Sequence, residues 1–246
     1  TDVRINVDSA SLTVPSAVQR ALVPPVQVVT EPLADGVWLL GGGSHNSVAV
    51  EFQAHIAVIE APLNEERSLA VIEEVARLAP TKPIRFIVNT HHHWDHLGGL
   101  RAYVHEGATV ITHEGNRPYY QEVLRAGPWT LEPDRFSLHP PEEWSEGYIF
   151  ETLSEKYILA DRTQSVEIYN IQGLAHAAGM LIAYIPDERI VVQADLYFPT
   201  AITPNASAHP LSRNLQRLNL DVETIVGIHG RPATISQFTE FIGAEQ

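Results

Sequence analysis

The sequence contains no cysteine among its 246 residues. Disulfide bonds and thiolate metal ligands are therefore excluded, and a metal site in this chain has to be built from His, Asp and Glu side chains. The absence of cysteine does not indicate a redox compartment. We therefore leave the location open between the cytoplasm and, after removal of a signal peptide, the periplasm or the exterior.

Basic residues are also scarce: 16 Lys and Arg against 30 Asp and Glu give a formal net charge of −14 and an isoelectric point near 5.2. Most of the surface would repel a nucleic-acid backbone, so we expect no nucleic-acid partner. No apolar run reaches the length of a membrane-spanning helix, so we expect no membrane span. A small molecule is the expected partner, and the sequence does not indicate the oligomeric state.

Two segments depart from regular patterns. Residues 1–34 contain scattered prolines and no long helical period, and the chain begins with Thr1. We expect an extended lead-in, the tail of a segment removed upstream. Residues 35–246 are expected to form a single domain with a sizeable core. Within it, residues 127–150 are rich in proline and aromatic residues, which predicts a lid or pocket wall, with a surface flap as the alternative.

Strand and helix patterns alternate through this domain. Three β-rich runs, at 37–40, 47–52 and 55–59, are separated by short breaks, which predicts a β-meander. Apolar residues at helical spacing predict a helix over 64–79, with Asn64 as its N-cap. Further elements are expected as strands at 84–88, 108–111, 166–171, 181–185, 190–193 and 224–228, and as helices at 97–104, 118–125, 207–220 and from about 234. This order predicts two β-sheets with helices on their outer faces.

A cluster of metal-ligand side chains follows the apolar strand at 84–88. The stretch reads N-T-H-H-H-W-D-H-L-G-G, so that His91, His93, Asp95 and His96 stand at the spacing H-x-H-x-D-H. A strand that ends in such a cluster delivers it to the edge of a sheet. Imidazole and carboxylate groups suit zinc and similar divalent ions. A histidine-rich surface loop is the alternative, but the strand before the cluster and the Gly-Gly pair after it favour a metal site.

Three later residues complete the set. His176 lies in a turn of small residues between two predicted strands, and Asp195 and His229 each follow a predicted strand. Together with the first cluster they supply ligands for two ions about 3.5–4 Å apart. The first ion would take His91, His93 and His176, the second would take Asp95, His96 and His229, and Asp195 would bridge them.

At this point the sequence resembles the metallo-β-lactamase superfamily from about residue 35 to the C-terminus. The first cluster matches the H-x-H-x-D-H motif of this superfamily. The later His, Asp and His of the superfamily correspond, in the same order, to His176, Asp195 and His229. The resemblance implies an α/β fold, an αββα sandwich of two mixed β-sheets with helices on the outer faces and the metals at one edge. It also implies two divalent ions, zinc first with iron or manganese as alternatives, and hydrolysis as the default activity.

Mechanistically, the two ions would lower the pKa of a bridging water, and the resulting hydroxide would attack a small carboxylic ester, lactone or related acyl substrate. Asp95 is the expected catalytic residue, because it can orient the nucleophile and pass a proton to the leaving atom. His45 in the glycine-rich loop, Trp94 and Tyr197 are the expected substrate contacts. Thr90 and its neighbour Asn89 are candidates for bonding to the ligands from behind.

Several activities remain as alternatives. Members that hydrolyse β-lactams more typically carry another residue at the position of Asp195, so a lactonase or esterase is favoured over a β-lactamase. Phosphodiesterase and sulfatase branches use the bridging aspartate as well, and iron-dependent persulfide dioxygenases share part of the ligand set. A scaffold without catalytic activity is disfavoured, because no ligand of the set is missing.

Overall fold

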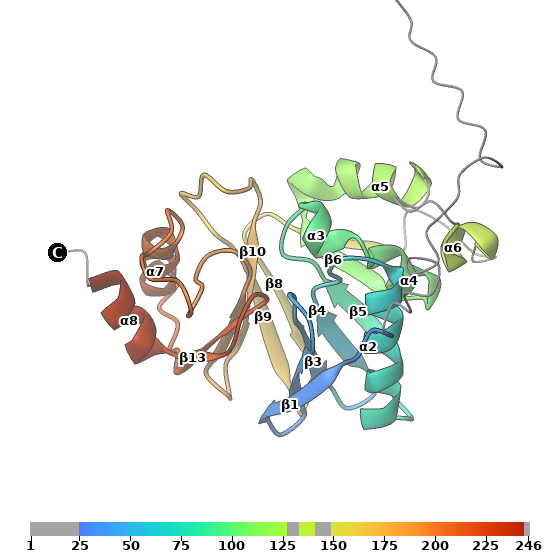
Figure 1. The fold of residues 1–246 in the computed structure, drawn as a ribbon, viewed down its shortest axis with the longest axis horizontal. Coiled ribbons are helices and arrows are strands. Elements are labelled where there is room, and N and C mark those ends of the chain that lie inside the picture. Colours follow the sequence, from blue (N-terminus) through green and yellow to red (C-terminus); the bar gives the residue numbers. More distant parts are fainter. Residues whose placement is uncertain (1–24, 127–132, 141–148, 244–246) are drawn as a thin grey trace, which may run out of the picture.

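Two β-sheets pack face to face, with helices on the outer face of each (Figure 1). The computed structural model describes residues 25–126, 133–140 and 149–243, so most of the predicted excursion at 127–150 and most of the predicted lead-in lie outside the described residues. Within the described part of the chain, no helix combines the length and the apolar character that crossing a bilayer requires. The αββα sandwich predicted from the sequence is confirmed.

The first sheet is mixed. Its strands stand in chain order: β1 (Val29–Ala34), β2 (Val37–Gly41), β3 (Ser47–Glu51), β4 (Ile56–Ile59), β5 (Ile84–Val88), β6 (Thr109–His113) and β7 (Phe150–Leu153). The pairs from β1 to β4 are antiparallel, which confirms the meander, and those from β4 to β7 are parallel. The sheet begins with β1, before the boundary predicted at residue 35. This edge strand is half exposed and contains Pro32, so it has little apolar alternation to recognise.

The second sheet is also mixed. Its strand order is β13 (Ala233–Thr234), β12 (Thr224–Gly227), β11 (Ile190–Gln193), β10 (Leu181–Ile185), β9 (Ser165–Asn170) and β8 (Lys156–Ala160). Only β11 and β12 pair in parallel. The sequence did not predict β7, β8 and β13, because they are short and partly exposed.

Two cores hold the layers together. Val48 and Val50 of β3 point into the core between the sheets, whereas Ala49 between them points to the helices outside. The first sheet is covered by α2 (Glu65–Leu78), α4 (Leu100–His105), α5 (Arg117–Ala126) and α6 (Arg135–Leu138), and the second by α7 (Ala208–Arg217) and α8 (Ile235–Gly243). Because both faces of a strand such as β4 are buried, its sequence, Ile-Ala-Val-Ile, is a continuous apolar run.

Helix boundaries follow local signals, with one correction. The side chain of Asn64 accepts a hydrogen bond from the amide of Arg67 at 2.9 Å, which confirms it as the cap of α2. The helix predicted over 97–104 is instead divided into α3 (Trp94–Leu97) and α4. The break lies at Gly98 and Gly99, where an added Cβ would lie 2.1 Å from the carbonyl oxygen of Leu63 and 2.0 Å from a serine hydroxyl, respectively. This close packing requires glycine at both positions.

A buried ion pair fastens α6 to the rest of the first layer. The guanidinium of Arg101 donates to both carboxylate oxygens of Asp134, and the same aspartate caps α6 by accepting from the amide of Ser137 at 2.8 Å. Arg101 also donates to the carbonyl of Leu124 in α5. Burial would raise the pKa of Asp134, but the hydrogen bonds from Arg101 and Ser137 outweigh it and lower the pKa.

Replacing Asp134 with asparagine is expected to lower the free energy of unfolding by about 3 kcal/mol near neutral pH, since Arg101 keeps its buried charge without a carboxylate. The lowered pKa means that this contribution is present above the unfolded pKa of about 3.9 and is lost as the pH falls through the folded pKa. Thermal unfolding of the unmutated chain and of Asp134→Asn should therefore show a difference in stability at pH 7, and this difference should become smaller near pH 3. The exposed pair of Glu106 with Arg135, at 3.9 Å, provides the control: Glu106→Gln should change stability little. A difference for Asp134→Asn that does not depend on pH would contradict the assignment.

Candidate metal centre

One edge of the sandwich gathers the ligand-type side chains. The neighbours β4 and β5 run in parallel in the first sheet, and β11 and β12 do so in the second, so the carboxyl ends of each pair meet at one edge. The ligand-type residues lie in loops and in one short helix. The loop after β5 carries His91 and His93, and helix α3 directly after it carries Asp95 and His96. The loops after β11 and β12 carry Asp195 and His229, the loop between β2 and β3 carries His45, and the loop between β9 and β10 carries His176.

The first group consists of His91, His93, His176 and Asp195. One ligand atom from each lies within 4.8 Å of the ligand atoms of all the others. The Oδ2 atom of Asp195 is 3.0 Å from Nε2 of His176 and 3.2 Å from Nε2 of His91. The group therefore forms a compact set of three imidazoles around one carboxylate oxygen.

The second group consists of His45, Asp95, His96 and His229, again with ligand atoms within 4.8 Å of one another. Asp195 touches this group too, with Oδ2 at 3.1 Å from Nε2 of His96 and Oδ1 at 2.9 Å from Nε2 of His229. Asp195 thus lies between the two groups. The structure brings together all seven residues that the sequence singled out as ligands and adds His45 to them.

Hydrogen-bond partners on the side away from the centre fix the orientation of the buried imidazole rings. Nδ1 of His91 lies 3.0 Å from the hydroxyl of Thr90, and Nδ1 of His96 lies 3.1 Å from the carboxylate of Glu60. Nδ1 of His45 lies 2.9 Å from the hydroxyl of Ser44. In each ring Nε2 is left facing the centre. Such partners fix the ring orientation of histidines that bind metals.

The donor atoms fit divalent cations. Among the described residues, the buried Nε2 of His91 finds no hydrogen-bond partner, because its approach to Asp195 lacks hydrogen-bond geometry. Nε2 of His229 and Nε2 of His96 point at each other at 3.3 Å. Buried polar atoms that lack partners require an explanation, and a bound cation would provide one. The groups can hold metal ions, and imidazole with carboxylate suits zinc and its neighbours.

Glu60 is the functional residue that the sequence analysis missed. It directly follows β4 and is fully buried, with a positive φ of 79°. Its carboxylate accepts from the hydroxyl of Thr90 at 2.6 Å, from the amide of Thr90 at 3.1 Å and from the side chain of Asn89, and it lies against Nδ1 of His96. Thr90 and Asn89, the candidates for support from behind, are thus bonded to Glu60. In the sequence, the only indication of this role is a single acidic residue at the end of an apolar strand.

Charges in the metal-free site are strongly coupled. Burial would lower the pKa of His96, but hydrogen bonds to Asp195 and Glu60 outweigh it and raise the pKa to about 10. Burial would raise the pKa of Asp195, but its contacts with His229, His91 and His96 outweigh it and lower the pKa. Without a metal, the imidazole of His96 is therefore protonated on both nitrogens and positively charged at neutral pH, between two carboxylates. A cation in the second group has to displace one of these protons.

A hollow with a volume of about 500 Å³ opens beside the first group. Its lining includes His93, Asp95, His176, Asp195 and Phe198. His96, His229 and His45 are absent from this lining, so the hollow gives access to the first group and to Asp95. A small molecule can enter here and meet both carboxylates.

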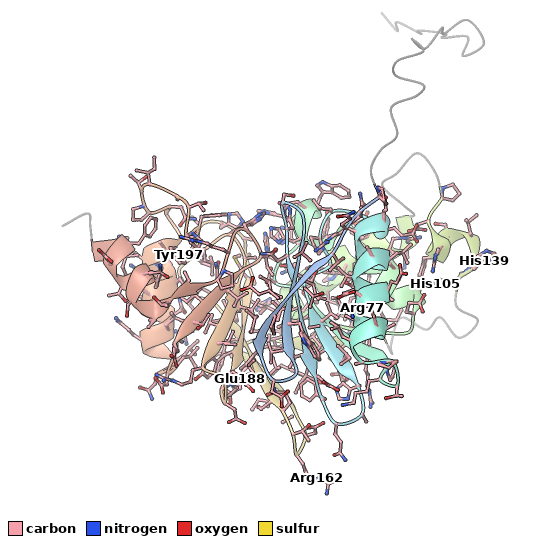
Figure 2. All side chains as sticks on the ribbon, turned by 60° about the horizontal axis from the view of Figure 1, so that its bottom comes forward. Arg77, His105, His139, Arg162, Glu188 and Tyr197 are labelled. Carbon is pink, nitrogen blue, oxygen red and sulfur yellow. The ribbon has the colours of Figure 1, made fainter. Side chains whose placement is uncertain are left out.

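The three residues predicted to contact substrate do not line this hollow. The ring of Tyr197 packs on Phe238 and Phe241 of α8, 4.8 and 5.3 Å away between centroids, on the side of the second sheet that carries the C-terminal helices (Figure 2). A tight turn directs it there, because Gln193 accepts from the amide of Tyr197 at 3.2 Å. Trp94 is 49% exposed on α3 and does not line the hollow. His45 is buried within the second group.

Comparisons with known proteins agree with this geometry. The family model described as the metallo-beta-lactamase superfamily matches residues 40–229. Similar solved structures are a metallo-beta-lactamase from Pontibacter korlensis, DIM-1 metallo-beta-lactamase and TMB-1, each with a TM-score of 0.66. In the same order, they cover 88%, 88% and 91% of this chain and 98%, 96% and 100% of their own chains. Their sequence identities to this chain are only 19%, 13% and 15%, so the similarity shows the fold alone.

One curated relative gives a sequence match. The 2,4-dinitroanisole O-demethylase subunit alpha of Nocardioides sp. (strain JS1661) is 25% identical over 201 residues, which are 79% of this chain. The match spans only 56% of that relative, little more than half of its length. The family match, in contrast, covers most of this chain and includes the strands and loops that carry the two groups. The chain therefore belongs to the metallo-beta-lactamase superfamily.

Proposed function

We propose that this protein is a dinuclear metal-dependent hydrolase of small carboxylic esters, lactones or related acyl compounds. The observation that carries the proposal is the position of Asp195 between two groups of histidines at the wall of an open hollow. In this proposal His91, His93 and His176 hold one ion, while Asp95, His96 and His229 hold the other. Asp195 is shared, and zinc is the first choice for both positions.

When bound, two divalent ions lower the pKa of a water molecule toward neutrality and polarise a carbonyl group. The chain itself supplies the proton transfer. The side chain of Asp95 is 42% exposed and lines the hollow, where it can hold a proton and pass it to the leaving atom. Phe198 and Ala175 supply apolar surface beside it, which suits an uncharged acyl substrate.

A second candidate reaction is the cleavage of an aryl methyl ether. It is favoured by the similarity to a relative whose name describes O-demethylation of 2,4-dinitroanisole. Hydrolysis of such an ether consumes one water and releases methanol and a phenol. Oxidative demethylation would instead consume oxygen and release formaldehyde, so the product identifies the chemistry.

Removing the metal tests the proposal. We expect chelator treatment to lower the turnover of an aryl ester or a lactone by at least about 10³-fold, because several kcal/mol of charge stabilisation are lost, and added zinc to restore it. Initial rates should be measured on a lactone, a thioester, a β-lactam, an aryl ester, a phosphodiester and 2,4-dinitroanisole, with the metal content read on the same sample. About two ions per chain are expected.

Each contrary outcome has a meaning. Turnover that survives complete removal of metal would refute metal-dependent hydrolysis. Turnover of the β-lactam or the phosphodiester alone would move the substrate class to one of the alternatives. Iron in place of zinc, together with oxygen uptake on a persulfide, would identify an oxidoreductase instead of a hydrolase.

A further inference from the structure

We propose that His45 is an additional protein ligand of the second ion, alongside Asp95, His96, His229 and the shared Asp195. This inference deepens the proposed function and rests on its assumption that two ions are bound. His45 comes from the loop between β2 and β3, far in sequence from the H-x-H-x-D-H cluster. The sequence analysis treated it as a substrate contact.

The spacing of the donor atoms fits one bound cation. Ligand atoms about 2.0–2.1 Å from a zinc ion at tetrahedral angles lie about 3.3 Å from one another. Nε2 of His45 is 3.2 Å from Oδ2 of Asp95, which in turn is 3.5 Å from Nε2 of His96. Nε2 of His96 is 3.3 Å from Nε2 of His229, and the His45 and His229 rings are 4.1 Å apart between centroids. His45 therefore adds one more donor at coordination spacing to the group that Asp95, His96 and His229 form with the shared Asp195.

The ring of His45 is oriented for this role. Its Nδ1 lies 2.9 Å from the hydroxyl of Ser44, so that Nε2 is directed to the group. The side chain is buried, and the only side chain that Nε2 contacts within hydrogen-bond distance among the described residues is Asp95. A residue held in this way can either coordinate an ion or merely support Asp95, and the experiment below separates these two roles.

The backbone of the loop is tied to the strand that delivers His229. The amide of Asn46 donates to the carbonyl of Ile228 at 2.7 Å, and its side chain donates to the carbonyls of Gly227 and Gly230 at 3.0 and 2.8 Å. These bonds join the loop after β2 to the end of β12. The relative positions of His45 and His229 are therefore set across the two sheets by the same hydrogen bonds.

The additional protein ligand makes the two metal positions unequal. The hollow is lined by His93, His176, Asp95 and Asp195, and His45, His96 and His229 are not part of that lining. With Asp195 shared, the second ion would have five protein ligands and the first would have four. The ion with more protein ligands has fewer positions open to water, and we expect it to be held more firmly. We expect the second ion to be the last one that a chelator removes.

Cobalt titration of the metal-free protein tests the inference. Co²⁺ binding should be followed by its visible absorption and by competition with a chelator in three proteins: the unmutated chain, His45→Gln and His139→Gln. Glutamine can still donate to Asp95 but is a poor metal ligand. His139 is exposed beside α6, away from the site, and provides the matched control (Figure 2). Thermal unfolding of the metal-free proteins checks that each is folded.

We expect His45→Gln to lose at least about 100-fold in affinity for one of two ions and to change the spectrum of that ion alone, since loss of a supporting contact by itself costs about 10- to 100-fold. The His139→Gln protein should match the unmutated chain. Two ions bound with unchanged affinity and spectrum in His45→Gln would overturn the inference and leave the proposed function intact. An unmutated chain that binds no ion would instead overturn the proposed function. Should His45→Gln fail to fold, a crystal structure of the unmutated zinc-loaded protein decides: Nε2 of His45 within about 2.0–2.1 Å of an ion supports coordination, and a distance of hydrogen-bond length or more refutes it.

Discussion

Replacing Asp195 with asparagine is expected to lower kcat/KM by about 10²- to 10⁴-fold, together with the loss of at least one ion. Asp195 contacts His91, His96, His176 and His229, at distances between 2.9 and 3.2 Å, and thereby joins both groups. Asparagine keeps the size of the side chain but removes its charge and turns two N–H donors toward the centre. Removing one partner of a buried charge pair costs about 3–5 kcal/mol, and each 1.36 kcal/mol corresponds to a factor of ten.

The measurement is kcat/KM on the best substrate of the panel, with metal content determined on the same preparation. Asp187→Asn is a suitable control, because Asp187 is exposed in the turn that precedes β11, whereas Asp195 follows that strand. This control should retain full activity and both ions. An Asp195→Asn protein that keeps two ions and normal turnover would show that the carboxylate does not bridge.

Replacing Glu60 with alanine is expected to have the largest effect on folding, a loss of about 3–5 kcal/mol in the free energy of unfolding of the metal-free protein. The buried donors of Asn89 and Thr90 and the Nδ1 of His96 would all lose the carboxylate that they contact. Unsatisfied buried donors are costly, and the imidazolium of His96 would keep Asp195 as its remaining buried counter-charge. For a protein of this size the melting temperature should fall by roughly 10 °C.

Thermal unfolding of the metal-free proteins measures this effect, with Glu73→Ala on the exposed face of α2 as the control. The control should change stability by less than about 0.5 kcal/mol. Glu60→Gln keeps the volume of the side chain, so it should fold and bind metal about 10- to 100-fold more weakly. Equal melting temperatures for Glu60→Ala and the unmutated chain would contradict the role assigned to this network.

Much of the fold was predictable because its signals are local. The apolar runs of the meander, the helical spacing after Asn64 and the strand before His91 each lie within a few residues, and the structure contains all of these elements. The edge strand β1 was not predicted as part of the sheet, because it is half exposed and contains Pro32. The division of the helix at Gly98 was also missed. It arises from contact with the loop at Leu63, far away in the sequence.

The candidate site shows the same division. The spacing of four ligand-type side chains after one strand was enough to identify His91, His93, Asp95 and His96 as candidates. The places of Tyr197 and His45 could not be deduced in this way. Tyr197 faces α8 because Gln193 binds the backbone of the turn after Asp195, and His45 lies in the second group because Asn46 fastens its loop to β12.

The sequence by itself determined the donor chemistry of this protein, because a chain without cysteine offers a cation no thiolate and leaves imidazole and carboxylate as its main ligands. It also determined the types of most secondary-structure elements, since hydrophobic period and caps act within a single segment. Only the tertiary structure decided that Glu60 and His45 join the donors that the sequence had singled out. Glu60, His45 and Asp195 come from three separate loops, and their side chains converge because the two sheets pack with the carboxyl ends of their parallel strand pairs at one edge. That packing depends on long-range burial of both faces of the central strands, which no short stretch of sequence specifies.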